Sequence, residues 1–177
     1  MGKTFSKENV YAKILFLGLE DSGKTTLLYN KIMNGNITTV ATDSHNIEIL
    51  PPIEGLSMAV WDLGGHKSIR RRWEDHFDGT DGIIFVVDSA NQRRFIEVKD
   101  ELFKLFDNDV LNGVPICVIA HKQDLPDAES PNDLVDLIDM REVVSHEWRV
   151  FGTSTVTGTG IDTAFNNFAM LVKRNLK

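Results

Sequence analysis

The sequence contains a single cysteine among its 177 residues, Cys117, so no disulfide framework can form within the chain. Cys117 lies inside the apolar run "VPICVIA", where we expect it to be a small buried hydrophobic residue. No stretch approaches the roughly 18 consecutive apolar residues of a transmembrane helix, and "MGKTFSKENVYAKILFLG" at the start lacks the continuous apolar core of a secretory signal. These absences predict a protein of a reducing compartment that is cytoplasmic at least in part.

Basic residues are also scarce, since lysine and arginine total 19 against 26 aspartates and glutamates, a formal net charge of −7. A chain without a surplus of lysine and arginine has few side chains that could neutralise nucleic-acid phosphates and release their counterions. We therefore expect no nucleic-acid partner. A nucleotide is not excluded, because backbone amides, one lysine and a metal ion can hold a phosphate on an acidic protein. Repeats and linkers are absent, so we expect one domain over residues 1–177, with residues 1–10 as an N-terminal extension.

Short apolar runs alternate with longer amphipathic stretches along the chain. The runs too short and too apolar for surface helices predict buried parallel strands at 12–18, 82–88 and 115–121. Helical periodicity predicts helices at 23–33, 93–106 and 160–174. "NIEIL" and "LSMAVWD" flank "PPIEG", whose prolines and glycine predict a hairpin connection.

This order predicts an α/β fold with a doubly wound, mostly parallel sheet, one antiparallel edge strand, and helices on both faces. Ligands of such sheets bind at the carboxyl ends of the strands. Chemistry is therefore expected in the loops that follow residues 17, 62, 88, 121 and 153.

"GLEDSGKT" (18–25) fits the phosphate-binding pattern G-x-x-x-x-G-K-[ST] between a predicted strand and a predicted helix. Its glycines let backbone N–H groups surround phosphates at a helix N-terminus, Lys24 can reach the β- and γ-phosphates, and the Thr25 hydroxyl can ligate Mg²⁺. The candidate nucleotide-binding residues here are Gly18, Asp21, Ser22, Gly23, Lys24, Thr25 and Thr26. A chance turn is the alternative, and kinases, ATPases and GTPases all share the loop.

A candidate base-reading loop, "VIAHKQDLP" (118–126), follows another buried strand at the same edge. Asp124 could accept hydrogen bonds from N1–H and the exocyclic amine of guanine, whereas adenine offers no such pair of donors. The stem of Lys122 would lie along the base plane. Thr153, Ser154 and Thr155 would bring backbone N–H groups near guanine O6. The alternatives are a solvated polar turn and an ordinary loop rich in serine and threonine.

Taken together, "GLEDSGKT", Thr42, "WDLGGH", "HKQD" and "TST" resemble the five guanine-nucleotide motifs of small GTPases in order and spacing. "WDLGGHKSIRRRW" and "HKQDLPDA" are similar to the ADP-ribosylation-factor (Arf), Arf-like and Sar family over essentially the whole chain. The resemblance implies the P-loop small GTPase fold with a six-stranded sheet. It also implies GTP and GDP as ligands, Mg²⁺ as cofactor, and slow GTP hydrolysis in membrane trafficking or related regulation.

The same resemblance assigns roles within two switch segments, switch one around Thr42 and switch two at "DLGGH" (62–66). Thr42, with Thr38 and Thr39 as nearby competitors, would close over Mg²⁺ when the γ-phosphate is present, so the expected metal residues are Thr25, Thr42 and Asp62. Asp62 would hold a Mg²⁺-bound water, and the Gly65 N–H would contact the γ-phosphate. His66 stands where most relatives have glutamine, but Sar-type GTPases have histidine, and an imidazole can orient a water. The expected catalytic residues are therefore Lys24, Gly65 and His66.

The sequence departs from the family at several positions. His121 replaces the asparagine of the base-reading motif, and an imidazole offers one donor and one acceptor, so His121 should contact guanine less well and release GDP faster. Asp43, Ser44 and His45 replace small or aromatic residues of switch one. Of the aromatic effector patch of Arf proteins, only Trp61 remains by residue type. We still expect an effector, an exchange factor and a GTPase-activating protein around Trp61, and a monomeric chain.

"MGKTFS" fits the N-myristoylation pattern on Gly2, which would give weak, reversible contact with the cytosolic face of a membrane. "IRRRW" (69–73) suggests an arginine finger, but we expect these arginines to be solvated on the helix after switch two. Three functions are weighed: a regulatory GTPase, a hydrolysis-deficient GTP-binding scaffold, and a P-loop ATPase or small-molecule kinase. The base-reading loop and the hairpin favour the first.

Overall fold

A computed structural model describes residues 11–33 and 45–176. The predictions on Gly2 and on Thr42, with its neighbours in switch one, lie outside these residues. The strands are β1 (Ala12–Gly18), β2 (His45–Ile53), β3 (Leu56–Leu63), β4 (Gly82–Asp88), β5 (Ile116–His121) and β6 (Trp148–Gly152). The α-helices are α1 (Lys24–Met33), α2 (Lys67–Arg70), α3 (Phe95–Phe106), α4 (Pro131–Leu137) and α5 (Ile161–Asn175). Short 3₁₀ turns span Trp73–His76, Gln92–Arg94, Asp109–Leu111 and Met140–Glu142.

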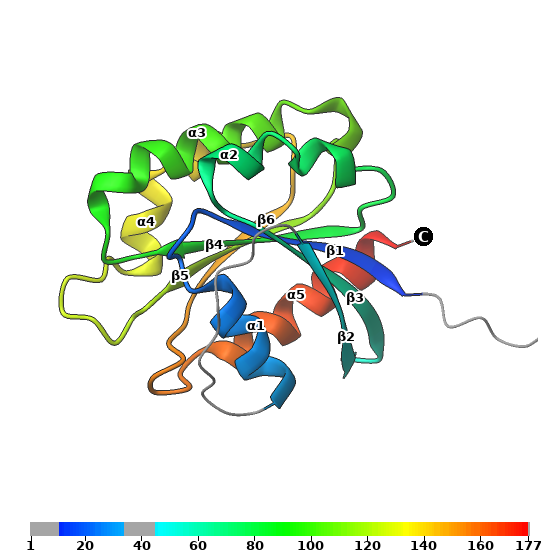
Figure 1. Cartoon of the computed structure of the whole chain (residues 1–177), viewed down its shortest axis with the longest axis horizontal. Helices are drawn as coiled ribbons and strands as arrows, with labels where there is room; N and C mark the ends of the chain where they lie inside the picture. Colours follow the sequence, from blue (N-terminus) through cyan, green and yellow to red (C-terminus); the bar gives the residue numbers. More distant parts are fainter. Residues whose placement is uncertain (1–10, 34–44, 177) are drawn as a thin grey trace, which may run out of the picture.

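The strands form one six-stranded sheet in the order β2-β3-β1-β4-β5-β6. All neighbouring pairs are parallel except β2 and β3, which pair antiparallel at the edge. Helices α1 and α5 cover one face of the sheet, while α2, α3 and α4 cover the other (Figure 1). The predicted doubly wound sheet with one antiparallel edge strand is therefore confirmed.

Side chains on the central strands are buried on both faces, which explains their unbroken apolar sequences. In β1, Ile14 and Phe16 pack toward α1 and α5, whereas Leu15 and Leu17 pack toward α3. Phe16 stacks on Phe165 of α5 with ring centroids 6.4 Å apart. Apolar side chains thus cover both faces of the sheet.

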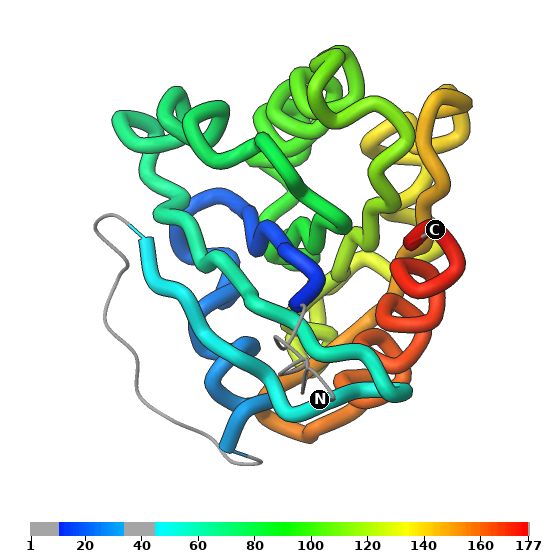
Figure 2. The backbone as a smooth tube through the Cα atoms, turned by 90° about the vertical axis from the view of Figure 1, so that its right-hand side faces the viewer, coloured from blue at the N-terminus to red at the C-terminus, as the bar shows by residue number. Residues whose placement is uncertain are grey.

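The β2–β3 hairpin forms one side of the sheet (Figure 2). Its turn consists of Glu54 and Gly55, both at positive φ (49° and 75°), and Ile53 pairs with Leu56. We expected the two prolines to lie in this connection, but Pro51 and Pro52 lie within β2. They are tolerated because β2 is an edge strand and its register shifts between Leu50 and Ile53, so the missing N–H groups leave no ladder bond unmade.

The predicted helices form with small shifts at their ends. The stretch 93–106 begins as a 3₁₀ turn and becomes α-helical only at Phe95. Helix α4 was not predicted, although Ser130 caps it by accepting from Asp133 N at 3.1 Å and Pro131 is its first residue. Among residues 11–33 and 45–176, no helix is long and apolar enough to cross a membrane.

Candidate functional site

A cleft of roughly 800 Å³ opens at the carboxyl edge of the sheet, where the sequence predicted the chemistry. Four loops line it, namely those after β1, β3, β5 and β6. They contribute residues from the segments 19–26, 65–69, 121–125 and 155–156. All the candidate nucleotide-binding segments that the structure describes therefore meet at this cleft.

The phosphate loop turns sharply between β1 and α1. Ser22 N donates to Leu19 O, and Leu27 N donates to Gly23 O, so helical hydrogen bonding starts at Gly23. Gly23 has a φ of 86°, and an added Cβ would lie 2.8 Å from Cδ2 of His121. Glycine is thus needed at position 23 both for its backbone angle and for close contact with the base-reading loop.

Lys24, Thr25 and Asp62 form a compact polar group at the end of β3. Lys24 Nζ lies 2.6 Å from Asp62 Oδ1, and Thr25 Oγ1 donates to Asp62 Oδ2 at 2.7 Å. Asp62 and Lys24 are almost completely buried. A hydroxyl and a carboxylate oxygen are the ligand types that Mg²⁺ prefers, so Thr25 and Asp62 fit a magnesium site beside the lysine.

Gly65 packs directly against the backbone of the phosphate loop. Its carbonyl accepts from Glu20 N at 3.1 Å. A Cβ at this position would lie 2.3 Å from Gly18 O and 2.6 Å from Glu20 N, closer than any side chain can stand. The second glycine of "DLGGH" is therefore required by this close approach of two loops.

His66 caps the short helix α2 and borders the cleft. Its Nδ1 accepts from Ser68 N at 3.3 Å and lies 2.8 Å from Ser68 Oγ. Because Nδ1 accepts a backbone N–H, the hydrogen of the neutral ring is on Nε2. The exposed ring therefore presents an N–H donor, which can orient a water molecule.

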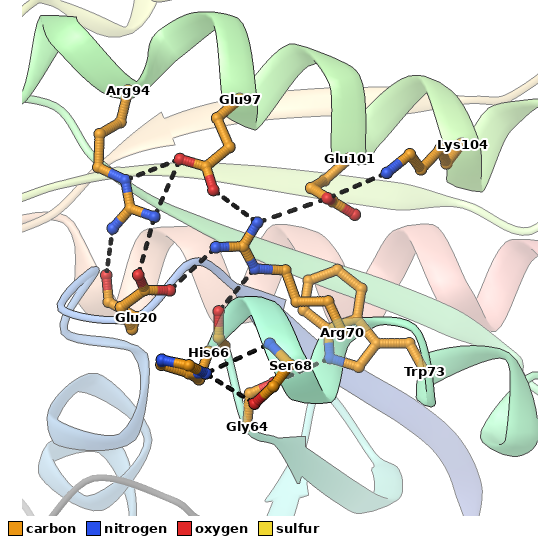
Figure 3. A network of polar contacts seen from close by, with 11 residues as sticks. Glu20, Gly64, His66, Ser68, Arg70, Trp73, Arg94, Glu97, Glu101 and Lys104 are labelled. Carbon is orange, nitrogen blue, oxygen red and sulfur yellow. Dashed lines mark hydrogen bonds and ion pairs between the residues drawn. The ribbon is translucent and has the colours of Figure 1, made fainter.

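Arg70 does not match the sequence-based expectation of a solvated side chain. Its guanidinium is 3% exposed and lies among Glu20, Glu97 and Glu101 (Figure 3). Nε donates to Gly65 O at 2.7 Å, and the other nitrogens lie 2.9 Å from Glu20 and 2.7 Å from Glu97. The expectation was wrong because Arg70, the last residue of α2, pairs with Glu97 and Glu101 of α3. The acidic residues spaced by four on α3 were the signal in the sequence.

The carboxylates around Arg70 respond to its charge. Burial alone would raise the pKa of Glu20 and of Glu97, but hydrogen bonds and Coulombic attraction from Arg70 and Arg94 lower both below the usual value. Arg94 also lies 3.1 Å from Glu20 and 3.0 Å from Glu97. This network joins the phosphate loop, switch two and α3, and it was not predicted from the sequence. Arg71 and Arg72 are exposed, as expected.

His121 is buried at the end of β5. Its Nδ1 lies 2.8 Å from Thr153 Oγ1, and it is only 2% exposed. Burial lowers the pKa of His121 to about 4, with a further contribution from Lys122, so the ring is neutral at physiological pH. Lys122 extends back to the phosphate loop, where Nζ donates to Asp21 O and to Asp88 Oδ2, both at 2.7 Å.

The last predicted nucleotide-binding segment divides into two parts. Thr155 lines the cleft, whereas Thr153 and Ser154 lie buried behind it. Thr153 N donates to Ala120 O and Ser154 N donates to Thr159 O, so both amides are engaged within the protein. The Ser154 hydroxyl donates to Asp124 Oδ1 at 2.7 Å. In the structure described here, Thr153 and Ser154 therefore support His121 and Asp124.

Trp61 of β3 lies in a cluster of three rings with His45 of β2 and His76. Its ring centroid is 5.9 Å from that of His45, stacked at 15°, and 5.5 Å from that of His76. Lys13 Nζ lies 4.8 Å from the centre of the Trp61 ring. Of the aromatic residues in the Arf effector patch, this chain has only Trp61. The two rings beside it are the imidazoles of His45 and His76.

Comparison with known proteins agrees with this geometry. A family model described as "ADP-ribosylation factor family" matches residues 1–172. The chain is 38% identical over 156 residues to ADP-ribosylation factor-like protein 3 of Chlamydomonas reinhardtii, a match that covers 88% of this chain and 87% of that protein. The fold is similar to that of the Arl6 BBS3 small GTPase from Trypanosoma brucei with bound nucleotide analogue GppNp. For that structure the TM-score is 0.85 and the identity 27%, over 94% of this chain and 99% of that one.

The resemblance deduced from the motifs and the predicted small GTPase fold are thereby confirmed. Small GTPases of this family bind GTP and GDP with Mg²⁺ and hydrolyse GTP, as the cleft, the phosphate loop and the Lys24–Asp62 pair lead one to expect. The chain belongs to the ADP-ribosylation factor (Arf) family of small GTPases.

Proposed function

We propose that this chain is a guanine-nucleotide-dependent switch that hydrolyses GTP slowly. The observation that carries the proposal is one cleft lined by both phosphate-binding and base-reading groups. Lys24 and Thr25, which contact Asp62, line this cleft together with Asp124. A cleft with this arrangement can hold a guanine nucleotide with its phosphates on the N-terminus of α1.

The phosphates would bind to groups already in place. The N–H groups of the turn at residues 21–26 and the Lys24 ammonium would surround the β- and γ-phosphates, and the Gly65 N–H would reach the γ-phosphate. Lys24, which is paired with Asp62, would then be shared between the carboxylate and the phosphates. The γ-phosphate thus distinguishes the GTP state from the GDP state through Gly65.

Thr25 and Asp62 would hold Mg²⁺, with Asp62 acting through a bound water and Thr42, outside the described residues, as the further predicted ligand. Bound there, the ion would neutralise charge on the β- and γ-phosphates. The hydrogen bond from Thr25 Oγ1 to Asp62 Oδ2 keeps the hydroxyl and the carboxylate together.

Hydrolysis would proceed by attack of a water oxygen on the γ-phosphorus. The bond from that phosphorus to the bridging oxygen breaks, GDP leaves with the electron pair, and the proton of the water ends on phosphate. His66 would orient the water through Nε2–H. The described residues that line the cleft include no arginine, and Arg70 is held by carboxylates. A slow reaction without a partner follows, since an arginine accelerates this step strongly.

We further propose the biological setting that the family suggests. An exchange factor, a GTPase-activating protein and an effector would bind near the switch segments, with the rings of His45, Trp61 and His76 as one contact surface. The chain would act as a monomeric single domain in membrane trafficking or related regulation. It would be cytoplasmic and held at the cytosolic face of membranes through an acylated Gly2.

Nucleotide selectivity tests the proposal directly. Equilibrium binding of GDP, GTP, ADP and ATP should show guanine nucleotides bound at least about tenfold more tightly, because Asp124 can pair with two guanine donors. Asp124→Ala should remove most of that preference, while the exposed neighbour Asp127, changed to Ala, is the matched control and should retain it. Equal affinity for ATP and GTP would instead identify a P-loop ATPase or kinase.

A further inference from the structure

The two glycines of switch two have their carbonyls held by two different side chains. Trp73 Nε1 donates to Gly64 O at 3.0 Å, and Arg70 Nε donates to Gly65 O at 2.7 Å (Figure 3). Both donors are buried, with Trp73 3% exposed and packed edge-on against Phe85 at 6.2 Å. Neither contact belongs to the regular hydrogen bonding of a helix or strand.

Holding the Gly64 carbonyl also orients the next amide. The C=O of Gly64 and the N–H of Gly65 belong to one planar trans peptide and point in opposite directions. The buried indole of Trp73 binds the Gly64 oxygen on the side of the core, so the Gly65 N–H points away from the core. Gly65 itself lines the cleft. The side chain of Trp73 therefore sets the direction of the amide that the proposed function assigns to the γ-phosphate.

The second peptide of the pair is fixed in the same way. Gly65 O accepts from both Arg70 Nε and Glu20 N, at 2.7 Å and 3.1 Å. Arg70 is in turn fixed by Glu97 on α3 and by Glu20 on the phosphate loop. The carbonyl thus connects switch two to the phosphate loop through one guanidinium.

External positioning is needed because the segment cannot hold itself. Two successive glycines have the widest backbone freedom of any dipeptide, and no side chain is tolerated at Gly65, where a Cβ would lie 2.3 Å from Gly18 O. We propose that Trp73 and Arg70 are positioning residues: Trp73 aims the Gly65 N–H at the γ-phosphate through Gly64 O, and Arg70 fixes the peptide on the other side of Gly65. The inference rests on the proposed function, and it assigns these residues to the preference for the triphosphate state.

The test is the ratio of affinities for guanosine 5′-(β,γ-imido)triphosphate and GDP, measured by equilibrium binding. Trp73→Phe keeps the buried ring but removes the indole donor, so the ratio should fall about three- to tenfold while GDP binding changes little. Trp148→Phe is the matched control. Trp148 Nε1 also donates to a backbone carbonyl, Val143 O at 3.2 Å, but lies at the opposite end of the sheet, so the ratio should stay unchanged.

Arg70→Lys is a second test, since it removes the Nε donor to Gly65 O and keeps a positive charge among the carboxylates. Arg70→Lys should lower the same ratio of affinities. If Trp73→Phe does not fold, this second variant tests the proposal by itself. Equal weakening of both nucleotides, or an unchanged ratio in a folded variant, would overturn the inference while leaving the proposed function standing. A wild-type protein that binds neither nucleotide would instead overturn the proposed function itself.

Discussion

His121 places Nδ1 2.8 Å from the hydroxyl of Thr153, joining the end of β5 to the loop after β6. The opposite edge of the ring lies against the phosphate loop, where a Cβ on Gly23 would come within 2.8 Å of Cδ2. The histidine thus connects three loops of the cleft from a buried position. Histidine here replaces the asparagine of the family, which changes the base-reading end of the site. We therefore expect changes in the rate of GDP dissociation and in the pH dependence of stability.

We predict that His121→Asn slows GDP dissociation about three- to tenfold. A carboxamide can donate to guanine N7 and still accept from a neighbouring group, whereas the neutral imidazole already uses one of its two nitrogens on Thr153. Release of a fluorescent GDP analogue by stopped flow measures the rate. His146→Asn is the control, because His146 is also buried but bonds to Leu111 O away from the cleft. An unchanged dissociation rate in His121→Asn would show that position 121 does not limit binding.

Stability should fall as the pH is lowered below about 6.5. The folded-state pKa of His121 is about 4, against 6.5 in the unfolded chain, so only the unfolded chain takes up the proton in between. The unfolded state binds more protons, and the free energy of unfolding therefore rises with pH over this interval. Between pH 7 and pH 5, the expected loss is about 2 kcal/mol. Urea unfolding at both values should show a smaller loss for His121→Asn, and an equal loss would exclude the histidine as its source.

Gly65→Ala should lower the affinity for a GTP analogue at least tenfold, with a much smaller change for GDP. The added Cβ would collide with Gly18 O at 2.3 Å, so switch two could no longer lie against the phosphate loop. Gly79→Ala is a suitable control, because a Cβ there meets nothing within 4 Å, although its φ of 71° adds some strain. Isothermal titration with both nucleotides measures the effect. Parallel losses for GDP and the analogue would contradict a role specific to the γ-phosphate.

The imidazole of His76, beside Trp61, should be protonated less readily than a free imidazole. Burial lowers the pKa of His76, and the nearby charges of His45, Lys13 and Arg72 lower it further, although Asp75 acts in the opposite direction. A titration of the His76 Cε1–H resonance by NMR should therefore have its midpoint below 6.5. His45→Phe should move that midpoint upward, because it removes a like charge. A midpoint at or above 6.5 in the wild type would rule out this electrostatic account of the surface.

Local patterns in the sequence predicted the elements and loops that depend on neighbouring residues. The apolar runs of β1, β4 and β5 were recognisable because both faces of these strands are buried. The phosphate loop was recognisable because glycines, a lysine and a hydroxyl must follow one another there. Contacts between distant segments left only a weak trace, the acidic residues Glu97 and Glu101 spaced by four on α3. Arg70 was therefore assigned wrongly to the solvent, because its partners lie in other segments, Glu20 in the phosphate loop and Glu97 in α3.

Two other pairs of residues show what the tertiary structure adds to local composition. Pro51 and Pro52 have the composition of a turn, and only the pairing of β2 at the sheet edge shows that a strand can hold them. Thr153 and Ser154 have the composition of a nucleotide-binding loop, but their amides bond to Ala120 and Thr159. The tertiary structure decides which backbone N–H groups are hydrogen-bonded within the protein. Local sequence patterns do not show it.

Single-turnover hydrolysis of GTP, followed as phosphate release with ATP as control, shows whether this chain is a slow GTPase. The wild-type protein should release phosphate slowly from GTP and not from ATP. His66→Ala should lose at least about tenfold in rate and His66→Gln should retain activity, because both histidine and glutamine can orient a water. No phosphate release from GTP by the wild type, with or without an activating partner, would instead identify a hydrolysis-deficient GTP-binding scaffold.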